Sequence, residues 1–233
     1  MFDLDGTLRY NKPSSLHFFL DCAVRLGVED NPENRRRAIR WAHRYWAQPE
    51  NLVNNLRLYF ERDERFLIDY SSQYLEAFGC DKKQAALLSV EVNRMMIDEF
   101  NPIDSVPVDV FETLEYLRSQ EFRLAIVTNR HEPCSKQLDS LGLSPYFEMT
   151  VIAGVINRWK PEAGIFTYAL DKMGINSSEA LYVGDNYYSD VVGAQQVGLS
   201  PVLIDPEGIF PEADCQVISR LGDLITLDYK MIK

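Results

Sequence analysis

The sequence predicts an α/β fold, with a doubly wound, mostly parallel sheet and an inserted all-α domain. From about residue 104 onward, short apolar runs alternate with helical segments. Because these runs lack the polar and apolar alternation of half-exposed strands, they are typical of parallel strands buried on both faces. Between residues 12 and 103 the chain instead shows long helical patterns and no convincing buried strand. We therefore expect a core built from residues 1–11 and 104–233, and a helical domain at 12–103.

The elements follow in chain order. The pair "MF" before Asp3 ends the first strand, and since strands normally run about five residues, we expect the natural chain to begin upstream of Met1. We expect Ser189 and Asp190 to cap the helix that they begin. The expected helices of the inserted domain are 34–48, 56–79 and 81–100. The expected strands of the core are 122–129, 149–154, 180–186 and 200–205, and its expected helices are 108–120, 131–142, 161–174 and 187–198.

Composition limits the classes of partner. The chain has 233 residues and a formal net charge of −11, so a general nucleic-acid or anionic-membrane surface is not expected. No apolar run approaches the roughly 18 residues of a membrane span, and no signal peptide is visible. The four cysteines are scattered without a CxxC pair, which argues against a zinc cluster or a disulfide scaffold. We expect a cytoplasmic protein that binds a small molecule.

Polar residues follow the predicted strands at the points where these strands end. Asp3 and Asp5 follow "MF", Thr128 follows "RLAIV", and Asp185 follows "ALYVG". In an open parallel sheet the ligand binds outside the carboxyl ends of the strands. We therefore expect these side chains to converge on one crevice, together with Lys160, which precedes a predicted helix.

Four motifs in this order resemble those of the haloacid dehalogenase superfamily. They are DxDGT at Asp3–Thr7, a hydroxyl residue at a strand end at Thr128, Lys-Pro at Lys160 and Pro161, and GDxxxxD at Gly184–Asp190. Each motif alone is weak, but all four agree in order and spacing. The helical domain between the first two resembles the inserted cap of that family, so the resemblance covers nearly the whole chain.

The resemblance implies a Mg²⁺ site. The ion would be held by the side chains of Asp3 and Asp185 and by the backbone carbonyl of Asp5, with water completing the coordination. Asp190 would act from behind these ligands, on metal-bound water and on Lys160. A hard, oxygen-rich site suits this ion.

The resemblance also implies roles in phosphoryl transfer. Asp3 would be the nucleophile that forms an aspartyl-phosphate, and Asp5 the general acid and then base. Thr128 and Lys160 would bind the phosphoryl group and balance its charge. Asn129 would either bind substrate with them or orient the loop.

These roles favour a phosphatase that hydrolyses a small phosphorylated metabolite. The choice depends on Asp5, because a dehalogenase has no leaving alkoxide to protonate and its family pattern lacks this second acid. Three alternatives stay open: a sugar phosphomutase, a 2-haloacid dehalogenase, and a non-catalytic binding protein on the same fold. The sequence does not indicate the oligomeric state.

Overall fold

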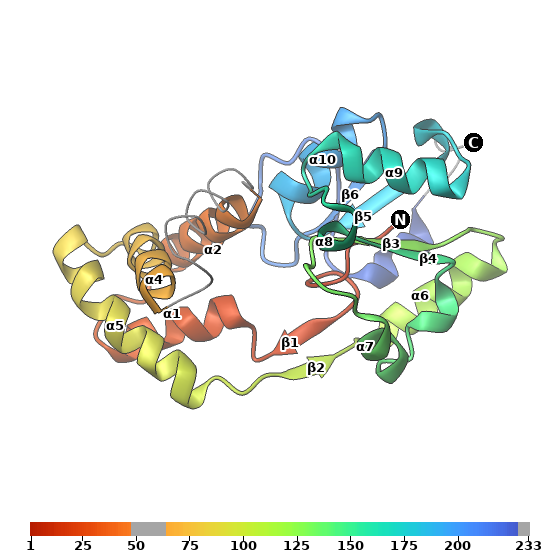
Figure 1. Cartoon of the computed structure of the whole chain (residues 1–233). Coiled ribbons are helices and arrows are strands. Elements are labelled where there is room, and N and C mark those ends of the chain that lie inside the picture. The colour runs from red at the N-terminus through yellow and green to blue at the C-terminus, as the bar shows by residue number, and fades with distance from the viewer. Residues whose placement is uncertain (48–63, 228–233) are drawn as a thin grey trace. The chain divides into compact units, whose positions relative to one another are not determined.

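The structure is a computed structural model that describes residues 1–47 and 64–227 (Figure 1). The chain forms two compact units. One consists of Met1–Tyr10 with Asp104–Lys233, and the other of Asn11–Ile103. The connecting segments β1 (Tyr10–Lys12) and β2 (Ile103–Ser105) pair with each other as a two-stranded sheet.

The first unit contains a parallel sheet. Strand β3 (Ala125–Thr128) pairs with β4 (Met149–Ile152), and β6 (Ser200–Ile204) pairs with β5 (Leu181–Gly184) and β7 (Gln216–Ile218), all in parallel. Phe2 joins the two groups, because it bridges to Ile126 on one side and Val183 on the other. The first residues therefore lie in the middle of the sheet. The α/β fold with a parallel sheet is confirmed, although the sequence analysis did not include β7.

Met1 is the first residue of this central segment. Its amino group donates a hydrogen bond to the Leu181 carbonyl oxygen at 2.7 Å.

Helices follow the strands along the first unit. They are α6 (Val108–Ser119), α7 (Ser135–Ser140), α8 (Ala153–Ile156), α9 (Ala163–Met173) and α10 (Val192–Gln196). Shorter turns are η1 (Ser144–Tyr146), η2 (Ser177–Glu179), the π-helical η3 (Tyr187–Val191) and η4 (Leu221–Thr226).

The central strands of the sheet are buried on both faces. Ile126 and Val183 belong to one apolar cluster, which also includes Leu114 of α6. Their neighbours Val127 and Tyr182 belong to another cluster, with residues of α9. Successive strand residues point to opposite faces, so burial of both faces explains the apolar runs without alternation.

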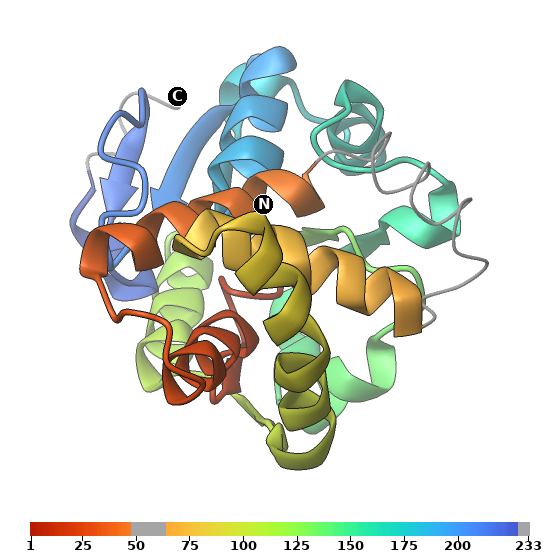
Figure 2. The same ribbon diagram turned by 90° about the vertical axis from the view of Figure 1, so that its left-hand side faces the viewer.

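The second unit is helical. Its described helices are α1 (Ser15–Arg25), α2 (Pro32–Trp46), α4 (Glu64–Phe78) and α5 (Lys82–Glu99), which pack against one another (Figure 2). The Asn31 side chain caps α2 by accepting from the backbone N–H of Glu33 at 2.9 Å. Trp41 lies 5.1 Å from Tyr45 and 5.9 Å from Tyr74 between ring centroids, so aromatic packing contributes to the core of this unit. The helix expected from residue 56 is described only from residue 64.

Two further expectations concern the whole chain. In the ranges that the structure describes, no helix combines the length and apolar character that a membrane span requires. The four cysteines are unpaired; Cys22, Cys80 and Cys134 are buried and Cys215 is half-buried.

Truncation of Leu114 tests the packing of α6 on the sheet. Leu114 is fully buried, whereas Val108 on the same helix is 73% exposed. We expect Leu114→Ala to lower the free energy of unfolding by about 2–5 kcal/mol, because a cavity remains. Val108→Ala should change it by less than about 0.5 kcal/mol. Urea unfolding followed by circular dichroism measures both, and equal losses would contradict this packing.

Candidate active site

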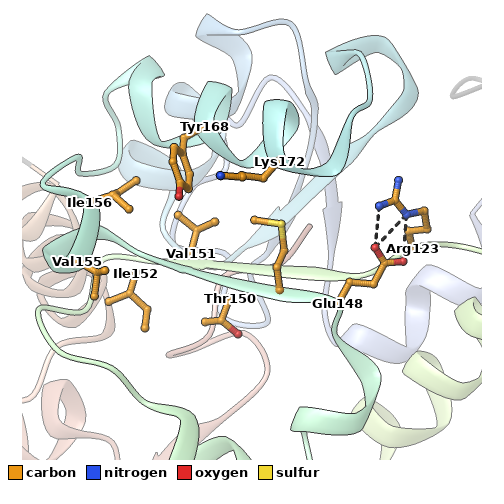
Figure 3. A pocket seen from close by; sticks show the side chains of 10 residues that line it. Arg123, Glu148, Thr150, Val151, Ile152, Val155, Ile156, Tyr168 and Lys172 are labelled. Carbon is orange, nitrogen blue, oxygen red and sulfur yellow. Dashed lines mark hydrogen bonds and ion pairs between the residues drawn. The ribbon is translucent and has the colours of Figure 1, made fainter.

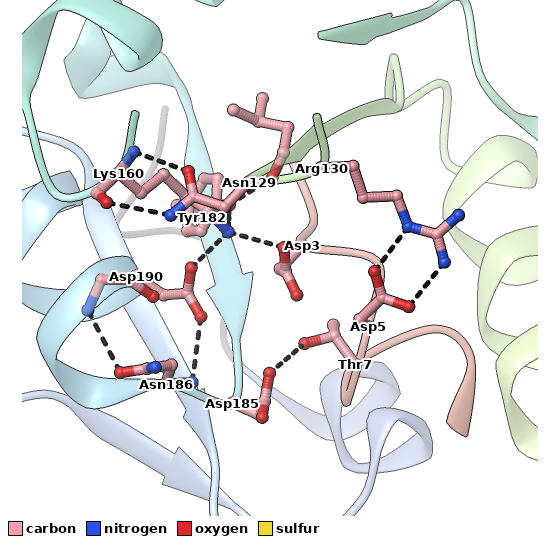
Figure 4. Close-up of polar contacts among 12 residues, drawn as sticks. Asp3, Asp5, Thr7, Asn129, Arg130, Lys160, Tyr182, Asp185, Asn186 and Asp190 are labelled. Carbon is pink, nitrogen blue, oxygen red and sulfur yellow. Dashed lines mark hydrogen bonds and ion pairs between the residues drawn. The ribbon is translucent and has the colours of Figure 1, made fainter. Parts of the chain in front are cut away.

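Three aspartates converge beyond the carboxyl ends of the central strands. Asp3 follows the first segment, Asp185 follows β5, and Asp190 lies in η3. One carboxylate oxygen from each lies within 4.8 Å of the others, and Figure 4 shows the three side chains around one centre. We call these residues the acid cluster. Asp3 and Asp190 are buried and Asp185 is half-buried.

Lys160 lies in the loop between α8 and α9 and reaches into the acid cluster. Its Nζ donates to Asp3 Oδ1 at 2.6 Å and to Asp190 Oδ1 at 2.7 Å. The third hydrogen bond goes to the Tyr182 hydroxyl at 3.0 Å. The side chain is only 2% exposed, so all three N–H groups of a buried ammonium have acceptors.

The cluster carries more negative charge than Lys160 can balance. Burial raises the pKa of Asp3 to about 7. The charge of Lys160 opposes this shift, and the charge of Asp190 adds to it. Burial and the charges of Asp3 and Asp190 also raise the pKa of Asp185 well above its usual range. Burial alone would lower the pKa of Lys160, but the charges of Asp190 and Asp3 outweigh it and raise that pKa. With every acid ionised, the excess of two negative charges calls for a cation or for bound protons.

Two glycines of the motifs make room for the aspartates. Gly6 has a positive φ of 89°, and a Cβ there would lie 2.4 Å from Asp185 Oδ2. A Cβ on Gly184 would lie 2.3 Å from Asp190 Oδ2. Any side chain at either position would displace a carboxylate. The Thr7 hydroxyl also donates to Asp185 Oδ1 at 3.3 Å, which connects the first motif to the fourth.

Asp190 is held by protein donors on both oxygens. Oδ1 accepts from Lys160 at 2.7 Å, and Oδ2 accepts from the Asn186 backbone N–H at 2.9 Å. The Asn186 side chain caps the following turn by accepting from the backbone of Tyr188 and Ser189 at 3.0 and 3.2 Å. The expected cap at Ser189 and Asp190 is therefore wrong, because the turn begins earlier and directs Asp190 back toward the cluster.

Thr128 and Asn129 lie where the sequence placed them, at the end of β3. Thr128 is the last residue of the strand and is buried. Asn129 accepts from the Lys160 backbone N–H at 2.7 Å and donates to the Lys160 carbonyl oxygen at 2.9 Å. Of the two alternatives left open for Asn129, these contacts correspond to orienting the loop.

Asp5 lies beside the acid cluster but turns its carboxylate toward Arg130 (Figure 4). Arg130 Nε donates to Oδ2 at 2.6 Å and Nη2 donates to Oδ1 at 2.7 Å. No role was predicted for Arg130 or for Tyr182. Arg130 directly follows Thr128 and Asn129, which was an available signal, whereas Tyr182 is concealed within an apolar strand.

The residues fit a divalent cation. Asp190 is 1% exposed and each of its oxygens already accepts from the protein, so Asp3 and Asp185 are the side chains more open to an ion. Asp3 Oδ2 accepts no hydrogen bond from the described residues. The donor set is oxygen only and negatively charged, which suits Mg²⁺.

A separate cavity of about 400 Å³ lies between β4 and α9 (Figure 3). Its lining includes Thr150, Tyr168 and Lys172, with the ion pair of Arg123 and Glu148 at one end. None of the acid cluster lines this cavity. It is therefore distinct from the site described above.

The sequence profile of the haloacid dehalogenase-like hydrolases matches residues 1–198. The chain belongs to this family. This chain is 29% identical to 5-amino-6-(5-phospho-D-ribitylamino)uracil phosphatase YigB of Escherichia coli, over 97% of this chain and 94% of that protein. It is 37% identical to ribulose-1,5-bisphosphate 5-phosphatase of Halopiger xanaduensis, but over only 44% of this chain and 43% of that one.

Solved structures share the fold. The 2-haloacid dehalogenase from Pseudomonas syringae pv. Tomato DC3000 matches with a TM-score of 0.54 and 26% identity, over 96% of this chain and 94% of that chain. The family predicted from the four motifs is therefore confirmed for this chain.

Tyr182 tests the support of Lys160. Its hydroxyl accepts from Lys160 and donates to the Val127 carbonyl oxygen at 2.8 Å, in a fully buried position. We expect Tyr182→Phe to lower the free energy of unfolding by about 1–3 kcal/mol, because a buried N–H and a carbonyl lose partners. Chemical unfolding measures the loss. A loss as small as that of an exposed substitution would contradict the assignment.

Magnesium should stabilise the protein in a pH-dependent way. The raised pKa of Asp3, about 7, means that the metal-free folded state holds a proton that the unfolded state releases. Its stability therefore falls as pH rises from about 4 to about 7. Because a carboxylate must lose its proton to bind metal, we expect Mg²⁺ to raise the melting temperature more at about pH 8 than at about pH 6.

Asp185→Asn is the control for this experiment. It removes a ligand and a repelling charge, so the metal-free variant should be more stable than the natural sequence and respond little to Mg²⁺. Thermal unfolding with Mg²⁺ and with a chelator checks this. An equal response in both proteins would place the ion elsewhere.

Proposed function

We propose that this hydrolase is a Mg²⁺-dependent phosphatase that cleaves a small phosphomonoester through an aspartyl-phosphate. The observation that supports this best is the position of Asp3, which Lys160 holds at 2.6 Å beside Asp185. In this proposal residues 1–11 and 104–233 are the catalytic core and residues 12–103 the cap. The protein acts in the cytoplasm on a metabolite, without nucleic acid or membrane.

Asp3 acts as the nucleophile. Lys160 donates to Oδ1, so the carboxylate keeps a defined orientation for attack. Attack forms a bond from the carboxylate oxygen to phosphorus and releases the leaving oxygen. Lys160 and Thr128 balance the charge on the phosphoryl oxygens, and Asn129 holds the backbone of Lys160 in place.

Asp5 acts as the acid that protonates the leaving oxygen and then as the base that takes a proton from water. Splitting the displacement into two steps requires one group that serves in both directions. Water then attacks phosphorus, releases phosphate and restores Asp3.

Mg²⁺ would be held by Asp3, Asp185 and the backbone carbonyl of Asp5. When bound, it would neutralise the excess charge of the acid cluster and polarise the phosphoryl group. Asp190 would orient Lys160 and the water around this ion.

The relatives support a phosphatase. YigB, which matches over almost its whole length, is a phosphatase of a phosphorylated small molecule, as is the Halopiger protein. We therefore infer a phosphorylated metabolite as the substrate class. A phosphomutase and a dehalogenase use related sites, and product analysis separates them.

A substrate panel tests this function. We expect release of phosphate from p-nitrophenyl phosphate and from at least one phosphorylated metabolite, with Mg²⁺ and not with a chelator. Asp3→Asn should lower kcat/KM by at least about a thousandfold, because no nucleophile remains. Full activity in that variant would refute the role of Asp3 as the nucleophile. Release of halide from a 2-haloacid would indicate a dehalogenase instead of a phosphatase. Isomerisation of a hexose phosphate would indicate a phosphomutase.

A further inference from the structure

The carboxylate of Asp5 is held from two sides by guanidinium groups. Arg130 forms the two-point contact described above, at 2.6 and 2.7 Å, and Arg9 Nη1 lies 2.9 Å from Oδ1. Two parallel N–H bonds from one guanidinium fix a carboxylate in orientation as well as in position. The rotamer of Asp5 is therefore determined by charged donors and not by packing alone.

The two arginines are fixed in turn by a closed ring of side chains. Arg130 Nη1 donates to Gln137 Oε1, Gln137 Nε2 donates to Asp104 Oδ2, and Arg9 Nη2 donates to Asp104 Oδ1. We call these five residues the arginine ring: Asp5, Arg9, Asp104, Arg130 and Gln137. They come from the first loop, the loop after β3, α7 and β2.

The two arginines of the ring are less exposed than the Asp5 carboxylate that they hold. Arg9 is buried and the Arg130 side chain is 22% exposed, whereas the Asp5 side chain is 40% exposed. The two guanidinium groups are thus largely buried, Asp104 lies at the surface, and the Asp5 carboxylate faces solvent. This is the arrangement expected for a functional carboxylate and not for a structural ion pair alone.

Charge explains why Asp5 needs this support. The acid cluster already combines three carboxylates with one ammonium. A fourth carboxylate would be repelled from this cluster unless cations lay on its other side. Arg9 and Arg130 supply that attraction.

The ring also distinguishes the two oxygens of Asp5. Oδ1 accepts from both Arg130 and Arg9, whereas Oδ2 accepts only from Arg130 Nε among the described residues. Since each carboxylate oxygen has about two acceptor sites, Oδ2 retains one for a further partner.

We propose that Arg130 is a positioning residue for proton transfer by Asp5, and that the arginine ring makes Oδ2 the atom that gives and takes the proton. The proton that Oδ2 keeps from the water of the previous turnover moves to the leaving oxygen as the bond from phosphorus to that oxygen breaks. In the second step Oδ2 takes a proton from the attacking water. This inference rests on the proposed phosphatase function and adds residues that the four motifs do not contain.

The test compares two leaving groups. An alkyl alkoxide needs a proton as it leaves, whereas p-nitrophenolate does not. We expect Arg130→Met to lower kcat/KM for the best alkyl phosphate of the panel about a hundredfold, and that for p-nitrophenyl phosphate less than about threefold. The ratio kcat/KM is the right measure, because it reports the steps up to departure of the leaving group.

Further variants separate positioning from folding. Arg130→Lys keeps the charge but loses the two-point contact, so it should show most of the selective loss. Gln137→Met leaves Arg130 in place but frees its outer N–H, so a smaller loss with the same selectivity is expected even if Arg130→Met does not fold. Arg123→Met is the matched control, since it breaks an ion pair between an arginine and a carboxylate in the same unit. It should leave kcat/KM for both substrates unchanged.

The outcomes are distinguishable. Equal losses on both substrates, or no loss, would overturn the role of Arg130 while leaving the phosphatase intact. Failure of the natural sequence to hydrolyse either ester would instead overturn the proposed function, whatever the variants do.

Discussion

The site depends on one buried ammonium group. Lys160 Nζ lies between Asp3 and Asp190 at 2.6 and 2.7 Å and is 2% exposed. A buried charge without partners would cost several kcal/mol, so this loop and both aspartates must occupy their positions together. The Tyr182 hydroxyl and the Asn129 amide complete the constraint, one at the side chain of Lys160 and the other at its backbone.

The same constraint explains the burial of like charges. Asp3 and Asp190 share Lys160, and Gly6 and Gly184 leave the space that the carboxylates occupy. The charge that Lys160 cannot balance makes this end of the sheet a place for a cation or a proton. In this hydrolase, the buried charges that repel one another therefore lie at the proposed site of the reaction.

The arginine ring lies beside the acid cluster and differs from it in charge, because its cations surround a single functional carboxylate. Around Asp5, two guanidinium groups face one carboxylate, and the arginines are themselves held by Asp104 and Gln137. Two aspartates only two positions apart in the sequence therefore have different surroundings. Asp3 is buried with an ammonium, while Asp5 is held by arginines and remains open to solvent. Such a difference suits two different roles in one reaction.

The sequence alone predicted four strands of the core and the polar residues that lie at their ends. Apolar runs without alternation predicted β3, β4, β5 and β6, because strands buried on both faces are mostly apolar. Polar residues at the ends of those runs predicted the meeting of Asp3, Asp185 and Lys160, because parallel strands end at one edge.

Tertiary structure decided what depends on groups far apart in the chain. Strand β7, the support of Lys160 by Tyr182, and the pairing of Arg130 with Asp5 across 125 positions follow from neighbours that no local pattern encodes. Periodicity and motif spacing report which face a residue takes and where a strand ends. Hydrogen bonds between distant side chains depend on how the elements pack, and only the folded chain sets that.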